Sequence, residues 1–278
     1  MELVAVDYQA PDAAERFVES LHKTGFGVLK NHPISQDLVE TIYEQWGRFF
    51  QTEQKHNFRF DPAKQDGFFP AEVSETAKGN NTKDLKEYFH FYPWGQCPDS
   101  LRLDLASYYA QANSLASELL TWVQRFGPTE MTEGYSEPLP SMVTGSEKTL
   151  LRVLHYPPMT GTEPAGALRA AAHEDINLLT ILPAANAKGL QIKNGDDWVD
   201  VPADFGTLVV NIGDMLQEAS KGYFPSTTHR VINPEEGVQN GSRISLPLFL
   251  HPRPEVVLSE RYTANSYLME RLRELGVI

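Results

Sequence analysis

Cysteine is nearly absent from this sequence, since Cys97 is the only one in 278 residues. A single cysteine excludes an internal disulfide and a cysteine-based zinc site, and it favours a reducing, intracellular environment. The chain also lacks any run that approaches the roughly 18 apolar residues of a membrane-spanning helix. Residues 1–12 have neither the basic nor the apolar segment of a secretory signal. We therefore expect a cytoplasmic protein with no membrane contact.

Positive charge is scarce as well. The chain has 24 lysines and arginines against 37 aspartates and glutamates, which gives a net charge of −13 at pH 7. An acidic chain without a local basic cluster repels phosphate backbones and anionic lipids, so a nucleic acid is not an expected partner. With 41% hydrophobic residues, the chain is able to bury a full core. We expect a globular chain, as a monomer or homodimer.

The first part of the chain, residues 1–127, has the spacing of helices. Apolar residues recur with helical periodicity in residues 12–24 and again after Ser35, which is a favourable N-cap residue. A longer amphipathic helix is predicted over residues 103–126, with its stop at Gly127-Pro128. We therefore expect this part to be mainly helical and to pack against something larger.

From residue 150 the pattern changes to short apolar runs separated by Pro, Gly, Asn and Asp, which is typical of a β-sandwich or jelly roll. The runs are residues 150–154, 176–182, 207–212, 229–232, 243–250 and 256–258. We expect one domain, mainly β with flanking helices, with a core over 150–258 and a C-terminal helix over 262–276. Residues 61–82 are expected to form a surface loop or lid. Residues 128–149 could be a linker, but we expect them to connect the helical part and the sheet within one domain.

The segment His173-Glu174-Asp175 carries two metal-binding side chains two residues apart, directly before an apolar run. In an extended strand, residues i and i+2 point to the same face, so this imidazole and this carboxylate can bind one ion. A third ligand is available from His229, which opens another strand-like run and reaches the same site if the strands are neighbours. Two imidazoles and one carboxylate that leave other positions of a metal open are typical of non-haem Fe(II) oxygenases.

Arg243 and Ser245 form the next pattern, because strand alternation places both on one face. A guanidinium binds a carboxylate through two parallel hydrogen bonds, and a hydroxyl adds one more. A buried arginine without an anion is costly. The pair therefore predicts an anionic co-substrate.

Several motifs follow one another in the order LLRVLHYPP, HEDINLLTIL, GLQIKNGDDWVDVP, GTLVVNIGDML, STTHRVI and SRISLPLFLHP, after an N-terminal TGFGVLKNHPIS. Together they resemble the isopenicillin N synthase-like (iron/ascorbate-dependent oxidoreductase) branch of the Fe(II)/2-oxoglutarate-dependent dioxygenase superfamily. The resemblance implies a distorted double-stranded β-helix, or jelly roll, with Fe(II), 2-oxoglutarate and molecular oxygen as reactants and ascorbate as an accessory reductant. It implies oxidation of a small molecule, usually hydroxylation, with release of succinate and carbon dioxide. No motif identifies the substrate, and desaturation or ring closure are the other outcomes.

The resemblance also implies residue roles. His173, Asp175 and His229 correspond to the iron ligands, and Arg243 and Ser245 to the residues that bind the distal carboxylate of 2-oxoglutarate. Two further residues belong to that pocket: Tyr156 contributes to it, and Leu154 stands where many plant-type members carry Asn.

Two alternatives stay open at this point. Oxidases of the same branch use no 2-oxoglutarate and turn the Arg and Ser toward a substrate carboxylate. A jelly roll that holds a metal can also be a non-redox binding module of the cupin kind. Among the other histidines, His155 is expected to face away from Tyr156, whereas His90 belongs either to a substrate mouth or to a buried hairpin edge.

Overall fold

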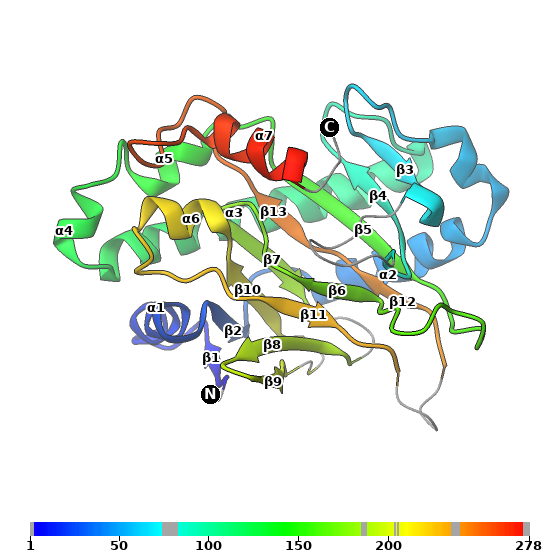
Figure 1. The fold of residues 1–278 in the computed structure, drawn as a ribbon, viewed down its shortest axis with the longest axis horizontal. Coiled ribbons are helices and arrows are strands. Elements are labelled where there is room, and N and C mark those ends of the chain that lie inside the picture. Colours follow the sequence, from blue (N-terminus) through cyan, green and yellow to red (C-terminus); the bar gives the residue numbers. More distant parts are fainter. Residues whose placement is uncertain are drawn as a thin grey trace.

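The computed structural model describes residues 3–73, 83–184, 188–202, 204, 206–234 and 240–274. In this part of the chain, a nine-stranded and a four-stranded sheet share one apolar layer, and the long helices lie beside the larger sheet (Figure 1). Most strand pairs are antiparallel, whereas the strands β1 (Ala5–Asp7) and β2 (Phe26–Lys30) run parallel. This is the mainly β, jelly-roll architecture with flanking helices that the sequence predicts.

The larger sheet joins strands from both halves of the sequence. Its order is β1 (Ala5–Asp7), β2 (Phe26–Lys30), β10 (Leu208–Ile212), β7 (Leu179–Pro183), β13 (Leu248–Leu250), β5 (Leu150–Tyr156), β4 (Glu87–Phe91) and β3 (Gly67–Phe69), and β12 (Arg243–Ser245) also pairs with β5. The part that was expected to be mainly helical therefore also supplies strands β1 to β4.

The smaller sheet carries the strands that bear the predicted metal ligands. Its order is β6 (Ala170–His173), β11 (His229–Val231), β8 (Leu190–Asn194) and β9 (Asp197–Asp200). In the antiparallel pair of β6 and β11, His173 and His229 are register partners.

The described residues form three long helices and several short ones. Three long ones are α1 (Ala13–Thr24), α2 (Gln36–Phe50) and α3 (Asp99–Phe126); the others are α4 (Thr129–Thr132), α5 (Leu139–Val143), α6 (Asp214–Ala219), α7 (Ala264–Glu274) and two 3-10 turns at Glu53–Phe58 and Ala71–Val73. The Ser35 hydroxyl accepts a hydrogen bond from the Leu38 N–H at 3.3 Å, which confirms the predicted N-cap. The predicted stop at Gly127 is confirmed as well.

Side-chain alternation along the strands creates two apolar layers. In β10, Leu208 and Val210 pack toward the helices, whereas Val209 lies between the two sheets. In β5, Val153 belongs to the helix side, and Leu154 and Tyr156 to the layer between the sheets. The inner layer is the smaller one, and the predicted site residues on β5, β6, β11 and β12 border it.

The structure differs from the prediction in two stretches, whereas the connection 128–149, for which no helix or strand was predicted or excluded, contains helices α4 and α5. Gly67–Phe69, expected in a surface loop, is buried strand β3, because Phe68 pairs with Phe89 of β4; residues 74–82 of that loop lie outside the described part. In the run 256–258, only Val257 forms an isolated bridge, with Thr263.

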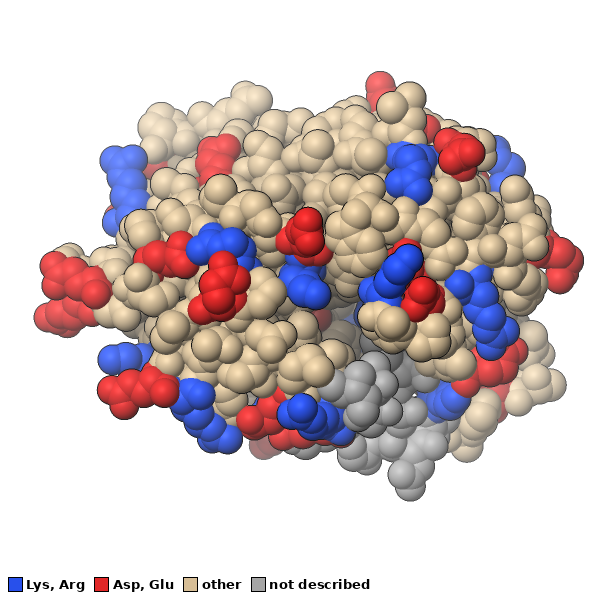
Figure 2. Space-filling view, turned by 90° about the horizontal axis from the view of Figure 1, so that it is seen from above, with Lys and Arg blue, Asp and Glu red and all other residues tan. Residues whose placement is uncertain are grey.

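The charged surface is mixed. Figure 2 shows acidic and basic side chains interspersed on the face seen from above, without one large patch of either sign. Across the described residues, none of the helices combines the length and the apolar character that crossing a membrane requires.

Candidate metal centre

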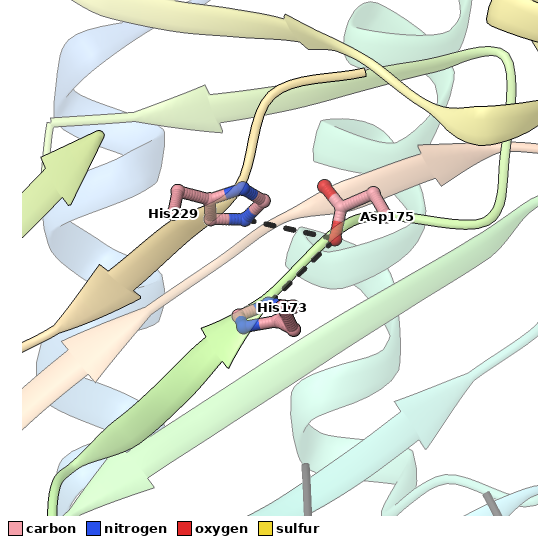
Figure 3. Close-up of side chains that lie close together, drawn as sticks. All are labelled: His173, Asp175 and His229. Atoms are coloured by element: carbon pink, nitrogen blue, oxygen red, sulfur yellow. Dashed lines mark ion pairs between the residues drawn. The ribbon is translucent and has the colours of Figure 1, made fainter. Parts of the chain in front are cut away.

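Two histidines meet across neighbouring strands. His173 ends β6 and His229 begins β11, and their ring centroids lie 4.4 Å apart. The Nε2 atoms of both rings lie 3.8 Å from Oδ1 of Asp175 (Figure 3). The three predicted ligands thus offer donor atoms that all lie within 4.8 Å of one another.

Backbone carbonyls fix the tautomer of both histidines. Nδ1 of His173 lies 2.8 Å from the carbonyl oxygen of Ala171, and Nδ1 of His229 lies 3.1 Å from that of Thr227. A carbonyl oxygen only accepts, so each Nδ1 carries the proton and donates it. In the neutral ring, Nε2 then keeps a lone pair that points toward Asp175.

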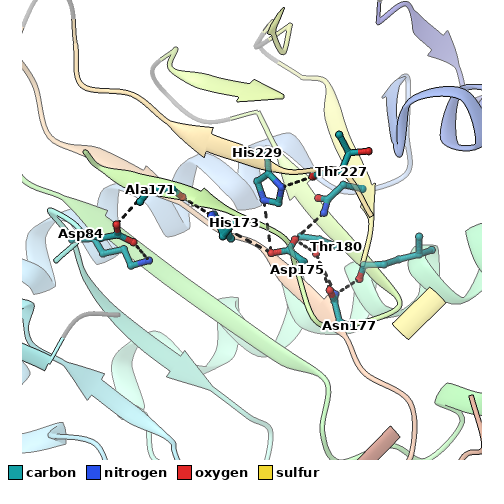
Figure 4. A network of polar contacts seen from close by, with 11 residues as sticks. Asp84, Ala171, His173, Asp175, Asn177, Thr180, Thr227 and His229 are labelled. Atoms are coloured by element: carbon teal, nitrogen blue, oxygen red, sulfur yellow. Dashed lines mark hydrogen bonds and ion pairs between the residues drawn. The ribbon is translucent and has the colours of Figure 1, made fainter. Parts of the chain in front are cut away.

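Asp175 is held from the side away from the histidines. The spacing predicted that Asp175 lies on an extended strand with His173. In the structure, Asp175 lies in the loop after β6. Its Oδ2 accepts hydrogen bonds from Thr180 Oγ1 at 2.6 Å and from Asn211 Nδ2 at 2.8 Å (Figure 4). With Oδ2 occupied in this way, Oδ1 remains for a shared ligand.

The protonation states suit a cation. Partial removal from water, followed by repulsion from His229, lowers the pKa of His173 to about 4. Burial opposes ionisation of Asp175, but His229, His173 and the two hydrogen bonds outweigh it, so the pKa of this carboxyl is below its ordinary value. Near neutral pH, the centre offers an anionic oxygen and neutral imidazole nitrogen.

This donor set fits a divalent metal. Two nitrogen lone pairs that face a carboxylate oxygen repel it unless a cation lies between them. Imidazole together with carboxylate suits iron among the first-row metals, and three ligands on one side leave further positions open. The exposure of the side chains agrees with open positions on such a metal. The His173 side chain is 38% exposed, whereas those of Asp175 and His229 are only 7% and 9% exposed.

A buried guanidinium lies in the same inter-sheet region. Arg243 is 2% exposed, and its central carbon lies 5.3 Å from the ring centre of Tyr156, its register partner on β5. Nε and Nη1 have no hydrogen-bond partner, and no carboxylate of the described residues forms an ion pair with this side chain. Burial lowers the pKa of Arg243, yet a guanidinium remains charged. The unpartnered charge of Arg243 therefore favours an anion supplied from outside the chain.

The other predicted pocket residues share that face. Ile244 packs toward the helices, so its neighbours Arg243 and Ser245 point to the opposite side of β12. Ser245 is buried and pairs in register with Leu154, and Leu154 and Tyr156 both belong to the inter-sheet layer. Leu154, which stands where many plant-type members of the resembled family carry Asn, thus presents an apolar side chain to the layer between the sheets.

Two histidines outside the centre are accounted for by packing. His155 stacks on Phe50 with ring centres 5.0 Å apart and bonds Glu87, so it faces away from Tyr156 as predicted. His90 is 6% exposed and accepts a hydrogen bond from Arg152 Nε at 2.9 Å. It belongs to the paired edge of β3 and β4, in agreement with the buried-hairpin interpretation.

Asn211 and Thr180, which orient Asp175, were not among the predicted site residues. Both are single polar residues within apolar strands, and they are register partners on β10 and β7. A buried amide and a buried hydroxyl need partners. Two such residues in neighbouring strands could therefore have indicated that a polar group lies beside them.

Removing one of these hydrogen bonds should weaken metal binding. Thr180→Val keeps the shape of the side chain but removes the donor to Asp175, and loss of an outer-shell partner typically costs about 10- to 100-fold in metal affinity. We expect a drop in Fe(II) affinity of that size, measured by anaerobic titration. Thr207→Val is the matched control, because the Thr207 hydroxyl bonds the Asp204 carbonyl and no other described residue. Equal Fe(II) affinity in Thr180→Val and the parent would contradict the positioning role.

Two family models match the chain. The model described as the 2OG-Fe(II) oxygenase superfamily matches residues 148–252, a range that contains every residue of the candidate centre and of the arginine pocket. The model described as the N-terminal part of non-haem dioxygenases in morphine synthesis matches residues 3–109.

Individual proteins show the same likeness. A feruloyl-CoA ortho-hydroxylase from Ipomoea batatas is 27% identical over 262 residues, which span 89% of this chain and 69% of that protein. A crystal structure of a candidate oxygenase from Shewanella oneidensis is 63% identical, has a TM-score of 0.91 and covers 100% of both chains. A full-length Neurospora crassa protein in complex with α-ketoglutarate (2-oxoglutarate) superposes with a TM-score of 0.81 at 23% identity, over 98% of this chain and 96% of that chain, and shows the fold.

Proposed function

The chain belongs to the superfamily of Fe(II)- and 2-oxoglutarate-dependent oxygenases, and from this premise we propose roles for its site residues. The protein is an oxidoreductase, a dioxygenase that uses Fe(II), 2-oxoglutarate and molecular oxygen. The predicted dioxygenase function is thereby confirmed over the oxidase and cupin-like alternatives.

We propose that His173, Asp175 and His229 hold the Fe(II). The observation that carries this is the convergence of two Nε2 lone pairs on Oδ1 of Asp175, each at 3.8 Å. The Nδ1 bonds to backbone carbonyls orient the two rings, and Thr180 and Asn211 orient the carboxylate.

Arg243 and Ser245 are proposed to bind the distal carboxylate of 2-oxoglutarate, with Tyr156 forming a wall of the pocket. The unpartnered Nε and Nη1 of Arg243 are buried N–H donors that an anion can satisfy. The Ser245 hydroxyl lies on the same face of β12. The apolar side chain of Leu154, which lies in the layer between the sheets, suits the methylene groups of the co-substrate.

Iron and 2-oxoglutarate, when bound, supply oxygen activation and the oxidation of a substrate carbon, with release of succinate and carbon dioxide. The protein has three tasks: to orient the ligands, to hold the co-substrate carboxylate and to keep water away from the reacting atoms. Burial of Asp175, His229 and Arg243 serves the last task.

Hydroxylation of a small molecule is the outcome that we propose, in line with the hydroxylase named among the relatives. The test is aerobic turnover of the iron-loaded protein with a panel of small organic acids, phenols and heterocycles, scored by succinate release and by mass increase of the substrate. A substrate-dependent succinate signal with addition of one oxygen atom is expected. Succinate with loss of two hydrogens instead would contradict hydroxylation and indicate desaturation or ring closure.

We further propose a single cytoplasmic domain, as monomer or homodimer. Strands β1 to β4 of the first part lie in one sheet with β5, β7 and β10 of the second. Limited proteolysis that cuts within 128–149 should therefore leave no pair of fragments that fold separately, as judged by circular dichroism of the purified pieces. Two stable, independently folded fragments would contradict the single domain.

A further inference from the structure

A second buried guanidinium lies beside Tyr156, the aromatic ring that Arg243 also approaches. Arg169 directly precedes β6 and is 2% exposed, with its Nε buried and without a hydrogen-bond partner. Its central carbon lies 6.0 Å from the ring centre of Tyr156, the same ring that Arg243 approaches to 5.3 Å. The two arginines therefore border one aromatic side chain.

Hydrogen bonds hold Arg169 in this position. Its Nη2 donates to the carbonyl oxygen of Gly241 at 2.9 Å, two residues before Arg243. Its backbone N–H donates to the Asn233 side chain at 3.0 Å. The head group is thus fixed at the entry of β12, close to the start of the strand that carries Arg243 and Ser245.

The charge of this pair is not balanced by the described part of the chain. No ion pair of Arg169 or Arg243 is found there, and the carboxylate of Asp84, which bonds the N–H of Ala171, is already paired with Lys86 at 2.9 Å. Burial and the proximity of Arg243 both lower the pKa of Arg169, yet its guanidinium stays protonated. Two like charges buried beside one aromatic ring repel each other, so an anion that contacts both is favoured.

We propose that Arg169 binds the distal carboxylate of 2-oxoglutarate together with Arg243, so that one carboxylate is held between two guanidinium groups. This inference rests on the proposed role of the pocket. It makes Arg169 a determinant of co-substrate specificity, because a 2-oxo acid without a second carboxylate would leave two buried cations unpaired.

The experiment compares two ligands. Iron-loaded, oxygen-free protein is titrated with 2-oxoglutarate and with 2-oxopentanoate, which has the same carbon chain but lacks the distal carboxylate; binding is followed by metal-to-ligand absorption. In Arg169→Gln, the dissociation constant for 2-oxoglutarate should rise by about 10- to 100-fold, as expected for one charge-assisted hydrogen-bonded contact. The constant for 2-oxopentanoate should stay unchanged or fall.

Two further variants complete the design. Arg169→Lys keeps the charge and most of the volume but loses the planar fork, so a rise of about tenfold is expected even where Arg169→Gln folds poorly. Arg102→Gln is the matched control: Arg102 also donates from Nη2 to a glycine carbonyl, that of Gly95 at 2.8 Å, but lies on α3. It should bind both ligands as the parent does.

The outcomes separate the two proposals. Parent-like affinity for 2-oxoglutarate in both Arg169 variants would overturn the role of Arg169 and leave that of Arg243 intact. Equal losses for both ligands would also overturn it, because they would indicate a structural role. Absence of 2-oxoglutarate binding in the parent itself would instead contradict the proposed pocket.

Discussion

Replacing His229 with alanine should abolish tight Fe(II) binding and, with it, turnover. His229 contributes one of the three donors that the described residues bring to the centre, and the remaining pair would be His173 and Asp175. Losing a ligand should cost more than the roughly 10- to 100-fold in affinity that loss of an outer hydrogen bond costs. Anaerobic Fe(II) titration of the metal-free protein measures the change directly.

His22→Ala is the matched control for this experiment. The Nδ1 of His22 also bonds a backbone carbonyl, that of Tyr223 at 2.8 Å, but the ring stacks on Tyr223, away from Asp175. It should bind Fe(II) like the parent. If His229→Ala retained parent affinity and stoichiometry, the three-residue centre would be refuted. Circular dichroism of both variants establishes that each is folded.

The second large effect is expected for Arg243→Lys. Lysine keeps the charge but cannot offer two parallel donors to a carboxylate, so 2-oxoglutarate should bind more weakly while the metal site is preserved. A charge-assisted hydrogen bond contributes about 1.5 to 3 kcal/mol, which corresponds to about 10- to 100-fold at 1.4 kcal/mol per decade. The measurement is the anaerobic 2-oxoglutarate titration, with Fe(II) affinity determined in parallel.

Ser245→Ala should act in the same direction more weakly, because it removes a single neutral donor of about 0.5 to 1.5 kcal/mol. The ordering parent, Ser245→Ala, Arg243→Lys in rising dissociation constant is the expected pattern. Identical 2-oxoglutarate affinity in all three proteins would exclude the pair from co-substrate binding. A parallel loss of Fe(II) affinity would show instead that Arg243 supports the metal centre.

The sequence was most informative where short spacing constrains geometry. Arg243 and Ser245 share a face because Ile244 between them is apolar and packs on the helices. The pairing of His173 with His229 depends on which strands are neighbours, a long-range property that only the ordered motifs indicated. The buried strand Gly67–Phe69 was missed because a three-residue strand between polar segments has no readable period.

Side chains that act through another residue were harder to predict. Strand alternation predicted that Asp175 shares a face with His173. Asp175 instead lies beyond the end of β6 and is oriented by hydrogen bonds from Asn211 and Thr180. Arg169 carried no motif, and its importance depends on burial and on the absence of a paired carboxylate in the described residues, neither of which can be read from composition.

The two kinds of anchor at the metal centre differ in their tolerance to mutation. The histidines are oriented by carbonyl groups of residues 171 and 227, and every amino acid supplies a carbonyl, so many replacements at these positions preserve the tautomer. Asp175 depends on an amide and a hydroxyl that only particular amino acids provide at positions 211 and 180. Substitutions around the metal centre are therefore tolerated unevenly. Positions 171 and 227 beside the histidines accept many amino acids, whereas positions 211 and 180 beside Asp175 accept few.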